Sequence, residues 1–234
     1  MEIAVIIQAR MNSRRLPGKV LKEVRGKPML QYTIDRLGQS IHDLRLILAT
    51  SDEDSDDPVA AYGKGNGLEV FRGELEDVAG RYAALVRKYD LPAFVRVTGD
   101  SPLIDSQLID AGLDSFATGQ FDMVTNVYPR SFPKGQSFEV LSAEVFLEAL
   151  PRMAEPGDRE HITQYFYRHA DRYRIYNVAS NTGNFAAENL SVDTADDFER
   201  FRQLMNDPDR PVMDYGWEEI LRLYKGLNSH ECAN

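Results

Sequence analysis

The chain has 234 residues, 43% of them apolar, and a formal net charge of −10. This size and composition suit one large α/β core, and the negative charge disfavours nucleic acid as a partner. The one cysteine, Cys232, excludes an internal disulfide, and the apolar N-terminus reaches Arg10 too soon for a signal peptide or membrane span, so we expect a cytoplasmic protein with no membrane partner.

Strands and helices alternate through the first hundred residues. The run Ile3–Ile7 is continuously apolar and β-branched, which is typical of a strand buried on both faces of a parallel sheet. The patterns that follow predict helices at 28–37, after the acidic stretch 52–57, and at 76–89, and strands at 45–50, 68–71 and 93–98. This order predicts a three-layer α/β/α fold with a Rossmann-like, mostly parallel sheet.

Beyond Gly119 strands and helices no longer alternate regularly. Short strands are expected at 122–126, 138–141, 173–178 and 190–192, and helices at 159–169 and 195–205, before a final helix anchored by Trp217 and Tyr224. No linker or repeat marks a second domain, so we expect a single domain over residues 1–234. The irregular segment 128–176 is predicted to be a mixed insertion or lid on the sheet.

The connection after the first strand, Gln8–Lys19, concentrates basic side chains in an acidic protein. It holds four cations together with Ser13 and the turn Pro17-Gly18; the cations are Arg10, Arg14, Arg15 and Lys19. A loop in this position lies at the carboxyl edge of the sheet, where open α/β folds bind ligands. Cationic donors and exposed backbone amides suit a triphosphate, and the alternative is a solvated basic loop without a ligand.

Five segments of the chain match a known family in order. Gln8–Lys19 with Gly26-Lys27-Pro28 resembles the N-terminal signature of the cytidylyltransferases, the family of CMP-KDO synthetases, acylneuraminate cytidylyltransferases and, most similar here, SpsF-type spore-coat polysaccharide proteins. The other matching segments are 70–73 with 76–78, 96–105, 159–163 and 192–199. The resemblance implies a Mg²⁺-dependent transfer of CMP from CTP to an acidic sugar or related small acceptor, with release of pyrophosphate, in the synthesis of glycan precursors.

The resemblance also implies roles for individual residues. The nucleotide-binding set would be Gln8, Ala9, Arg10, Ser13, Arg15, Lys19, Arg72, Thr98 and Asp100. Catalysis would fall to Arg10, Arg15, Lys19 and Asp100, and acceptor binding to Glu139 and His161. His161 could instead be a capped surface histidine. Related enzymes form homodimers, and the aromatic-rich segment 128–176 is the predicted contact.

Asp100 and Asp193 would share the metal. Each is expected to follow a strand at the carboxyl edge, and two carboxylates with phosphate oxygens and water would complete the oxygen shell that Mg²⁺ prefers. An alternative for Asp193 is a helix N-cap, a position that Thr194 could also fill. Asp100 could instead be a turn residue before Pro102.

Two other functions are compatible with an Asp-containing metal site on this fold. A nucleotide-sugar glycosyltransferase would bind a diphosphate and would not need the basic loop. A non-catalytic nucleotide-binding protein would not need to keep Arg10, Lys19, Asp100 and Asp193 together. Acceptor identity stays open, because Gln136 and Ser137 are neutral where SpsF-type relatives often carry an acidic residue.

Overall fold

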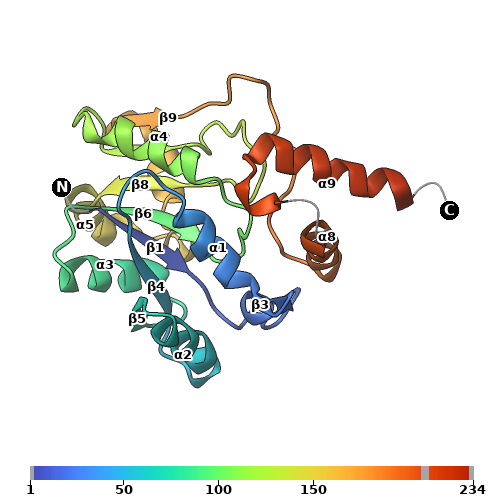
Figure 1. The fold of residues 1–234 in the computed structure, drawn as a ribbon. Coiled ribbons are helices and arrows are strands. Elements are labelled where there is room, and N and C mark those ends of the chain that lie inside the picture. Colours follow the sequence, from blue (N-terminus) through green and yellow to red (C-terminus); the bar gives the residue numbers. More distant parts are fainter. Residues whose placement is uncertain (1–2, 207–210, 232–234) are drawn as a thin grey trace.

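The computed structural model describes residues 3–206 and 211–231, so Cys232 lies outside the described part of the chain. Strands of this part form one seven-stranded sheet in the order β5-β4-β1-β6-β8-β7-β9 (Figure 1). They are β1 Ala4–Gln8, β4 Arg45–Ser51, β5 Glu69–Gly73, β6 Ala93–Thr98, β7 Met123–Thr125, β8 Glu139–Ser142 and β9 Ile175–Asn177. β8 pairs antiparallel with both of its neighbours, and the other pairings are parallel, which confirms the mostly parallel α/β fold.

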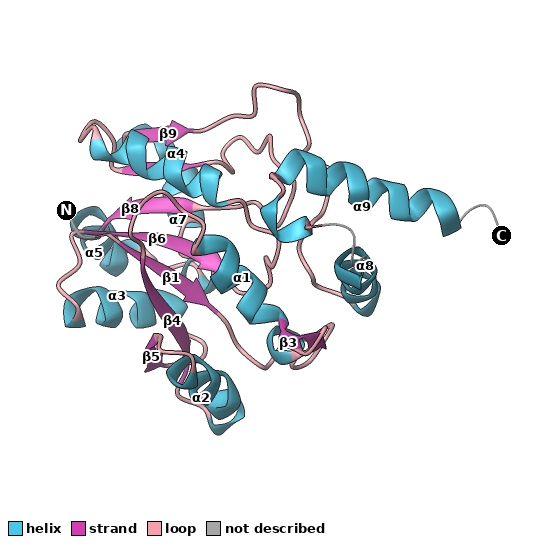
Figure 2. Ribbon diagram, in the orientation of Figure 1, coloured by secondary structure: helices cyan, strands magenta, loops and turns pink. Residues whose placement is uncertain are grey.

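Helices cover both faces of the sheet (Figure 2). They are α1 Met29–Leu37, α2 Asp57–Gly65, α3 Val78–Lys88, α4 Ser106–Ala117, α5 Ala143–Ala149, α6 Pro156–Glu160, α7 Gln164–Arg168, α8 Ala195–Asn206 and α9 Trp217–Glu231. A small hairpin pairs β2 Glu23–Val24 with β3 Lys27–Pro28. In the described part of the chain, no helix combines the length and the apolar composition that a membrane span requires.

The first strand shows why both faces must be covered. Val5 and Ile7 belong to the apolar cluster shared with α1, α4, α8 and α9, whereas Ala4 and Ile6 belong to the cluster shared with α3, α5 and α7. Successive side chains of a strand point to opposite faces, so a run without polar residues must be buried on both sides. The periodic segments of the first hundred residues therefore fold as predicted, to within two residues at their ends.

Two predicted elements differ from the structure. The helix expected at 159–169 is broken into α6 and α7, because His161 has an extended ψ of 70° and its backbone N–H closes α6 on Gly157. The strand expected at 190–192 is an irregular segment held by single backbone bonds, including Val192 N–H to Asp100 O at 3.0 Å. The helices α4 and α5 come in addition to the predicted ones.

The segment 128–176 completes the mixed half of the sheet. It supplies β8, which pairs with β6, and most of β9, which lies beside β7. Two of its tyrosines remain exposed at this end: Tyr128 stacks on Tyr167 with ring centres 4.9 Å apart, and Tyr176 stacks on Phe121.

Candidate active site

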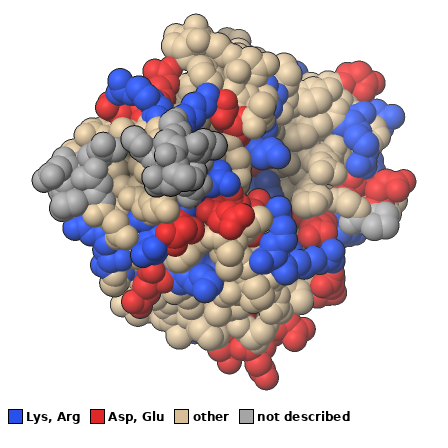
Figure 3. Space-filling model, turned by 90° about the vertical axis from the view of Figure 1, so that its right-hand side faces the viewer, with Lys and Arg blue, Asp and Glu red and all other residues tan. Residues whose placement is uncertain are grey.

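A cavity of about 490 Å³ opens at the edge of the sheet where β1 and β6 end. Figure 3 faces this edge and shows basic and acidic side chains gathered around its centre. The cavity is lined by Gln8, Ala9, Arg10, Ser13, Arg14, Arg15, Lys19, Val20, Arg96, Thr98, Asp100, Glu160, His161 and Asp193. Every predicted nucleotide, metal and acceptor residue except Arg72 and Glu139 lines this cavity.

The basic loop, Gln8–Lys19, is held in place by a hydrogen bond to a buried carboxylate. Asp56 is fully buried; its Oδ1 accepts the Met11 backbone N–H at 2.6 Å, and its Oδ2 accepts the Ser51 N–H at 3.1 Å. The loop then folds back on itself, because the Gly18 N–H donates to Met11 O at 2.8 Å with Gly18 in the left-handed region at φ +70°. Asp56 thus ties the loop to the end of β4.

The ends of β1 and β6 lie in close contact beside the basic loop. The Gly99 N–H donates to Gln8 O at 2.8 Å, and a Cβ on Gly99 would lie 2.9 Å from the Cβ of Ala9. Glycine is therefore required for the turn that follows β6 to approach the end of β1. The approach brings Asp100 to the mouth of the basic loop.

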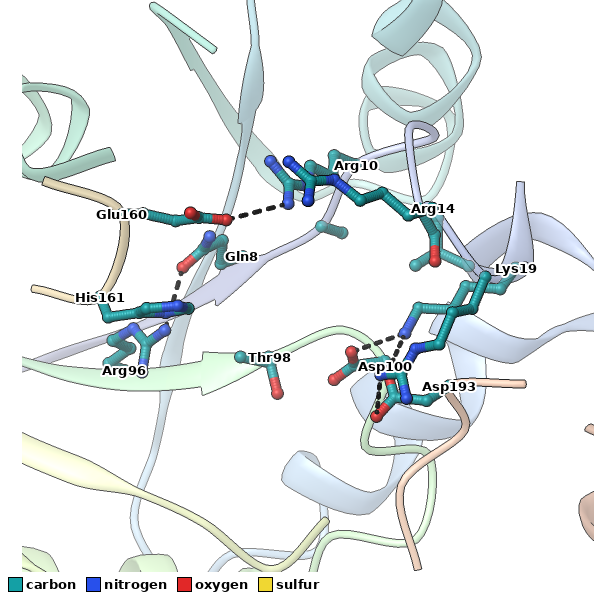
Figure 4. Close-up of a pocket in the computed structure, with 14 residues that line it drawn as sticks. Gln8, Arg10, Arg14, Lys19, Arg96, Thr98, Asp100, Glu160, His161 and Asp193 are labelled. Atoms are coloured by element: carbon teal, nitrogen blue, oxygen red, sulfur yellow. Dashed lines mark hydrogen bonds and ion pairs between the residues drawn. The ribbon is translucent and has the colours of Figure 1, made fainter. Parts of the chain in front are cut away.

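Lys19 lies at the centre of the charged end of the cavity. Its ammonium donates to Asp100 Oδ2 at 2.7 Å, to Val192 O at 2.8 Å and to Asp193 Oδ1 at 2.9 Å. Figure 4 shows these side chains together at one end of the cavity, with Thr98 between them and the opposite end. Asp100 and Asp193, 93 positions apart in the chain, thus converge on one point.

Asp193 is not needed to cap α8. Thr194 and Asp197 form a reciprocal capping pair: the Asp197 N–H donates to Thr194 Oγ1 at 3.1 Å, and the Thr194 N–H donates to Asp197 Oδ2 at 2.9 Å. The side chain of Asp193 instead receives Lys19 and an Arg15 guanidinium nitrogen at 2.9 Å. Burial raises the pKa of Asp193, but the hydrogen bonds and charges of Lys19 and Arg15 outweigh burial and hold the pKa below its ordinary value.

The opposite end of the cavity carries Gln8, Arg96, Glu160 and His161 (Figure 4). Arg96 Nη2 lies 3.4 Å from Gln8 Oε1, and Arg10 reaches across to Glu160 at 3.4 Å. His161 lies at the break between α6 and α7 and lines the cavity. This end is polar and carries both signs of charge.

Glu139, predicted to bind the acceptor, lies behind Arg96 and does not line the cavity. It is 5% exposed, and its Oε2 accepts Arg96 Nη1 at 3.1 Å. Its Oε1 accepts Thr163 Oγ1 at 2.9 Å and the Tyr167 hydroxyl at 3.3 Å. Burial lowers the pKa of Arg96, but the Glu139 carboxylate, together with Tyr82 and Tyr167, outweighs burial and raises it. Glu139 therefore positions the guanidinium that faces the cavity.

Arg72 also lies outside the cavity lining. Its guanidinium donates to Ser51 O and Glu53 O, both at 2.8 Å, and to Asp57 at 2.5 Å. These bonds attach β5 to the segment that leads into α2. The structure does not bring Arg72 together with the other predicted nucleotide-binding residues.

The structure adds Arg96 and Glu160 to the predicted set. A signal for Arg96 was present in the sequence, because it stands two positions before Thr98 in a strand and must point to the same face. Glu160 directly precedes His161, but a helix over 159–169 would have pointed the two side chains in different directions. Glu160 ends α6 and His161 follows it, and both line the cavity.

Comparison with known proteins identifies the family. Residues 4–227 match the profile of the cytidylyltransferases. The chain belongs to the cytidylyltransferase family. It is 32% identical over 210 residues to the spore coat polysaccharide biosynthesis protein SpsF of Bacillus subtilis, across 87% of this chain and 86% of that protein. It is 37% identical over 134 residues to the 3-deoxy-manno-octulosonate cytidylyltransferase of Aeromonas salmonicida, across 55% of this chain and 51% of that one.

Solved structures of cytidylyltransferases share the whole fold. A cytidylyltransferase from Leptospira borgpetersenii superposes with a TM-score of 0.90 at 28% identity, covering 98% of this chain and 96% of that one. The CMP:2-keto-3-deoxy-manno-octonic acid synthetase complexed with CTP superposes with a TM-score of 0.65 at 20% identity, covering 88% and 98%, which establishes the common fold. Membership of this family makes the chain a CTP-dependent nucleotidyltransferase and favours that function over the glycosyltransferase and the non-catalytic alternatives.

Proposed function

We propose that this cytidylyltransferase transfers CMP from CTP to an acidic sugar or a related small acceptor, with release of pyrophosphate, in the cytoplasmic synthesis of precursors for a surface polysaccharide. One observation carries the proposal: a single cavity has four basic residues and an aspartate pair at one end and a second polar end beside it. The first end suits a triphosphate, and the second has room for an acceptor. The similarity to SpsF and to a 3-deoxy-manno-octulosonate cytidylyltransferase supports the acidic sugar and the pathway.

The reaction is an in-line displacement at the α-phosphorus of CTP. An acceptor hydroxyl oxygen forms the new bond to phosphorus, and the bond from phosphorus to the bridging β-phosphate oxygen breaks with its electron pair, so that pyrophosphate leaves. The acceptor hydroxyl passes its proton to solvent water. Positioning and charge neutralisation dominate such transfers, and Arg10, Arg14 and Arg15 surround the cavity with charge for the departing pyrophosphate.

The aspartate pair fits a magnesium ion. Asp100, Asp193 and the Val192 carbonyl already supply three oxygens to one cationic group, the Lys19 ammonium, and these are the hard ligands that Mg²⁺ prefers. No group of three or more His, Cys, Asp or Glu side chains that could hold a metal occurs among the described residues. A bound Mg²⁺ would neutralise charge on the phosphates, and the phosphates would add the remaining oxygen ligands. Rv0371c of Mycobacterium tuberculosis, which shares this fold and is 20% identical to this chain, has been solved in complex with manganese.

The acceptor end offers Arg96 and His161 to an anionic sugar. Arg96 is held in place by Glu139, so its guanidinium is oriented before any acceptor binds.

The exposed Tyr128 and Tyr176 lie in or next to the mixed half of the sheet, and we assign them to a two-fold dimer contact. Light scattering at micromolar concentration tests the dimer, and a monomer in solution contradicts it.

The test is a pyrophosphate-release assay with each of the four ribonucleoside triphosphates, Mg²⁺, and a panel of acidic and neutral sugars. We expect pyrophosphate release only when the triphosphate is CTP and the sugar is acidic. Arg10→Ala should weaken CTP binding by about 10- to 150-fold, because it removes a charge-assisted phosphate contact worth about 1.5–3 kcal/mol. Arg87→Ala, an exposed arginine on α3 that does not line the cavity, is the matched control. Release with a neutral sugar or with another triphosphate refutes the substrate assignment.

A further inference from the structure

The Lys19 ammonium has no donor left for a phosphate. A lysine carries three N–H donors, and all three are used by Asp100, Val192 O and Asp193 at 2.7–2.9 Å. The side chain is 8% exposed, so the ammonium is enclosed by these oxygens and not by water. Lys19, predicted to contact the triphosphate, is thus engaged with the two proposed metal ligands instead.

The two carboxylates at this end of the cavity are paired with cations without a metal. Two carboxylates, Asp100 and Asp193, face two cations, Lys19 and Arg15, and both oxygens of Asp193 are engaged by them. A divalent cation arriving alone would meet an ammonium a few ångströms away and carboxylates that are already neutralised. Like charges at such distances repel strongly where water is partly excluded. A triphosphate brings the missing negative charge and offers new acceptors to the two basic side chains.

We propose that Lys19 is a positioning residue that holds Asp100 and Asp193 together in the nucleotide-free enzyme and keeps them from binding a divalent cation until CTP arrives. The inference rests on the proposed metal site of the transferase. When CTP enters, its phosphates compete for the ammonium and the Arg15 guanidinium, and the carboxylates become free to share a cation with the nucleotide. Nucleotide and metal then bind as one unit.

The experiment measures Mn²⁺ binding in the absence of nucleotide, from the EPR signal of free Mn²⁺. Lys19→Met removes the ammonium, and Lys19→Gln keeps a hydrogen-bonding side chain without the charge. Both variants should bind Mn²⁺ at least about tenfold more tightly than the wild type, because a positive charge beside the carboxylates is gone. Arg15→Met should show a smaller gain, since the Arg15 side chain is 64% exposed and screened by water.

Lys27→Met is the matched control. Lys27 forms an ion pair with Asp35 at 2.6 Å on α1 and does not line the cavity, so its loss should leave Mn²⁺ binding unchanged. A second readout is the increase in Mn²⁺ affinity that CTP produces, which should be smaller in the Lys19 variants than in the wild type.

Unchanged or weaker Mn²⁺ binding in a Lys19 variant that unfolds at the wild-type temperature overturns the inference. A lysine that only held the two carboxylates in place for the metal would give that result, because they would move apart once the lysine was removed. The proposed function fails separately: it fails if the wild type releases no pyrophosphate from CTP with an acidic sugar. Mn²⁺ binding by the variants is scored without turnover, so the two results are distinguishable.

Discussion

Replacing Glu139 with glutamine should destabilise the fold although the side chain keeps its shape. Glu139 is 5% exposed and neutralises Arg96, which is 13% exposed at its side chain. Burial lowers the pKa of the neighbouring Arg130, and the Glu139 carboxylate partly offsets that shift, so one carboxylate serves two guanidinium groups. Removing one partner of a buried ion pair costs about 3–5 kcal/mol. Arg96 keeps contact with the cavity, so the expected loss is about 3 kcal/mol, the lower end of this range.

Urea unfolding followed by circular dichroism measures this loss. In a chain of this size about 1 kcal/mol lowers the melting temperature by about 2–4 °C, so Glu139→Gln should melt about 6–12 °C below the wild type. The double variant with Arg96→Met should recover part of the loss, because the unpaired charge is removed. Glu69→Gln is the control; the side chains of Arg45 and Glu69 are 27% and 42% exposed, and loss of their pair should cost about 1 kcal/mol or less. A loss below about 1 kcal/mol in Glu139→Gln refutes the view that the pair is buried and coupled.

Three further predictions concern the aspartates and the start of α8. Asp100→Asn and Asp193→Asn should each lose most of the turnover with CTP at saturating Mg²⁺, and the double variant should be little worse than either, because the pair acts as a unit; additive losses contradict this. Thr194→Val should lower the free energy of unfolding in urea by about 1 kcal/mol through loss of the cap, and no change would show that Thr194 is not the cap. The pKa of Asp193 lies below its ordinary value when folded, so its contribution to stability is complete above about pH 4 and is lost as the pH falls through the lower folded pKa. An acid titration of wild-type stability against Asp193→Asn measures this contribution, and a constant difference across that range would contradict it.

The sheet and most helices could be predicted because their signals are local. Ile3–Ile7 and the helical spacing of Val78, Tyr82, Leu85 and Val86 depend only on which residues lie a few positions apart, and all four helix residues are buried as expected. The end of the helix at His161 was not predictable from such spacing. Its cause is a backbone conformation that the surrounding fold imposes, and no glycine or proline marks it in the sequence.

The position of Asp193 depends on contacts between loops that are far apart in the chain. Lys134 N–H donates to Glu188 O at 3.0 Å, and Leu190 N–H donates to Lys134 O at 2.8 Å, so the two loops run side by side. Gly135 allows this approach, because a Cβ there would lie 2.6 Å from the carbonyl carbon of Leu190 and its φ is +87°. Periodicity says nothing about such pairings, which is why residues 190–192 were predicted as a strand and Asp193 was identified through family resemblance alone.

The charge pattern of the chain bears on how its substrate arrives. A protein with a net charge of −10 repels a free triphosphate at long range, and the four basic residues of the loop attract it only within about a Debye length, roughly 8–10 Å. A divalent cation bound to the nucleotide reduces the long-range repulsion. In the proposed metal site the same cation would bind the carboxylates of Asp100 and Asp193, which Lys19 engages until phosphate oxygens compete for its ammonium. The weaker long-range repulsion and the pairing of the carboxylates with Lys19 have the same consequence. The arrangement favours a nucleotide that arrives with its cation over a nucleotide that meets a cation already bound to the enzyme.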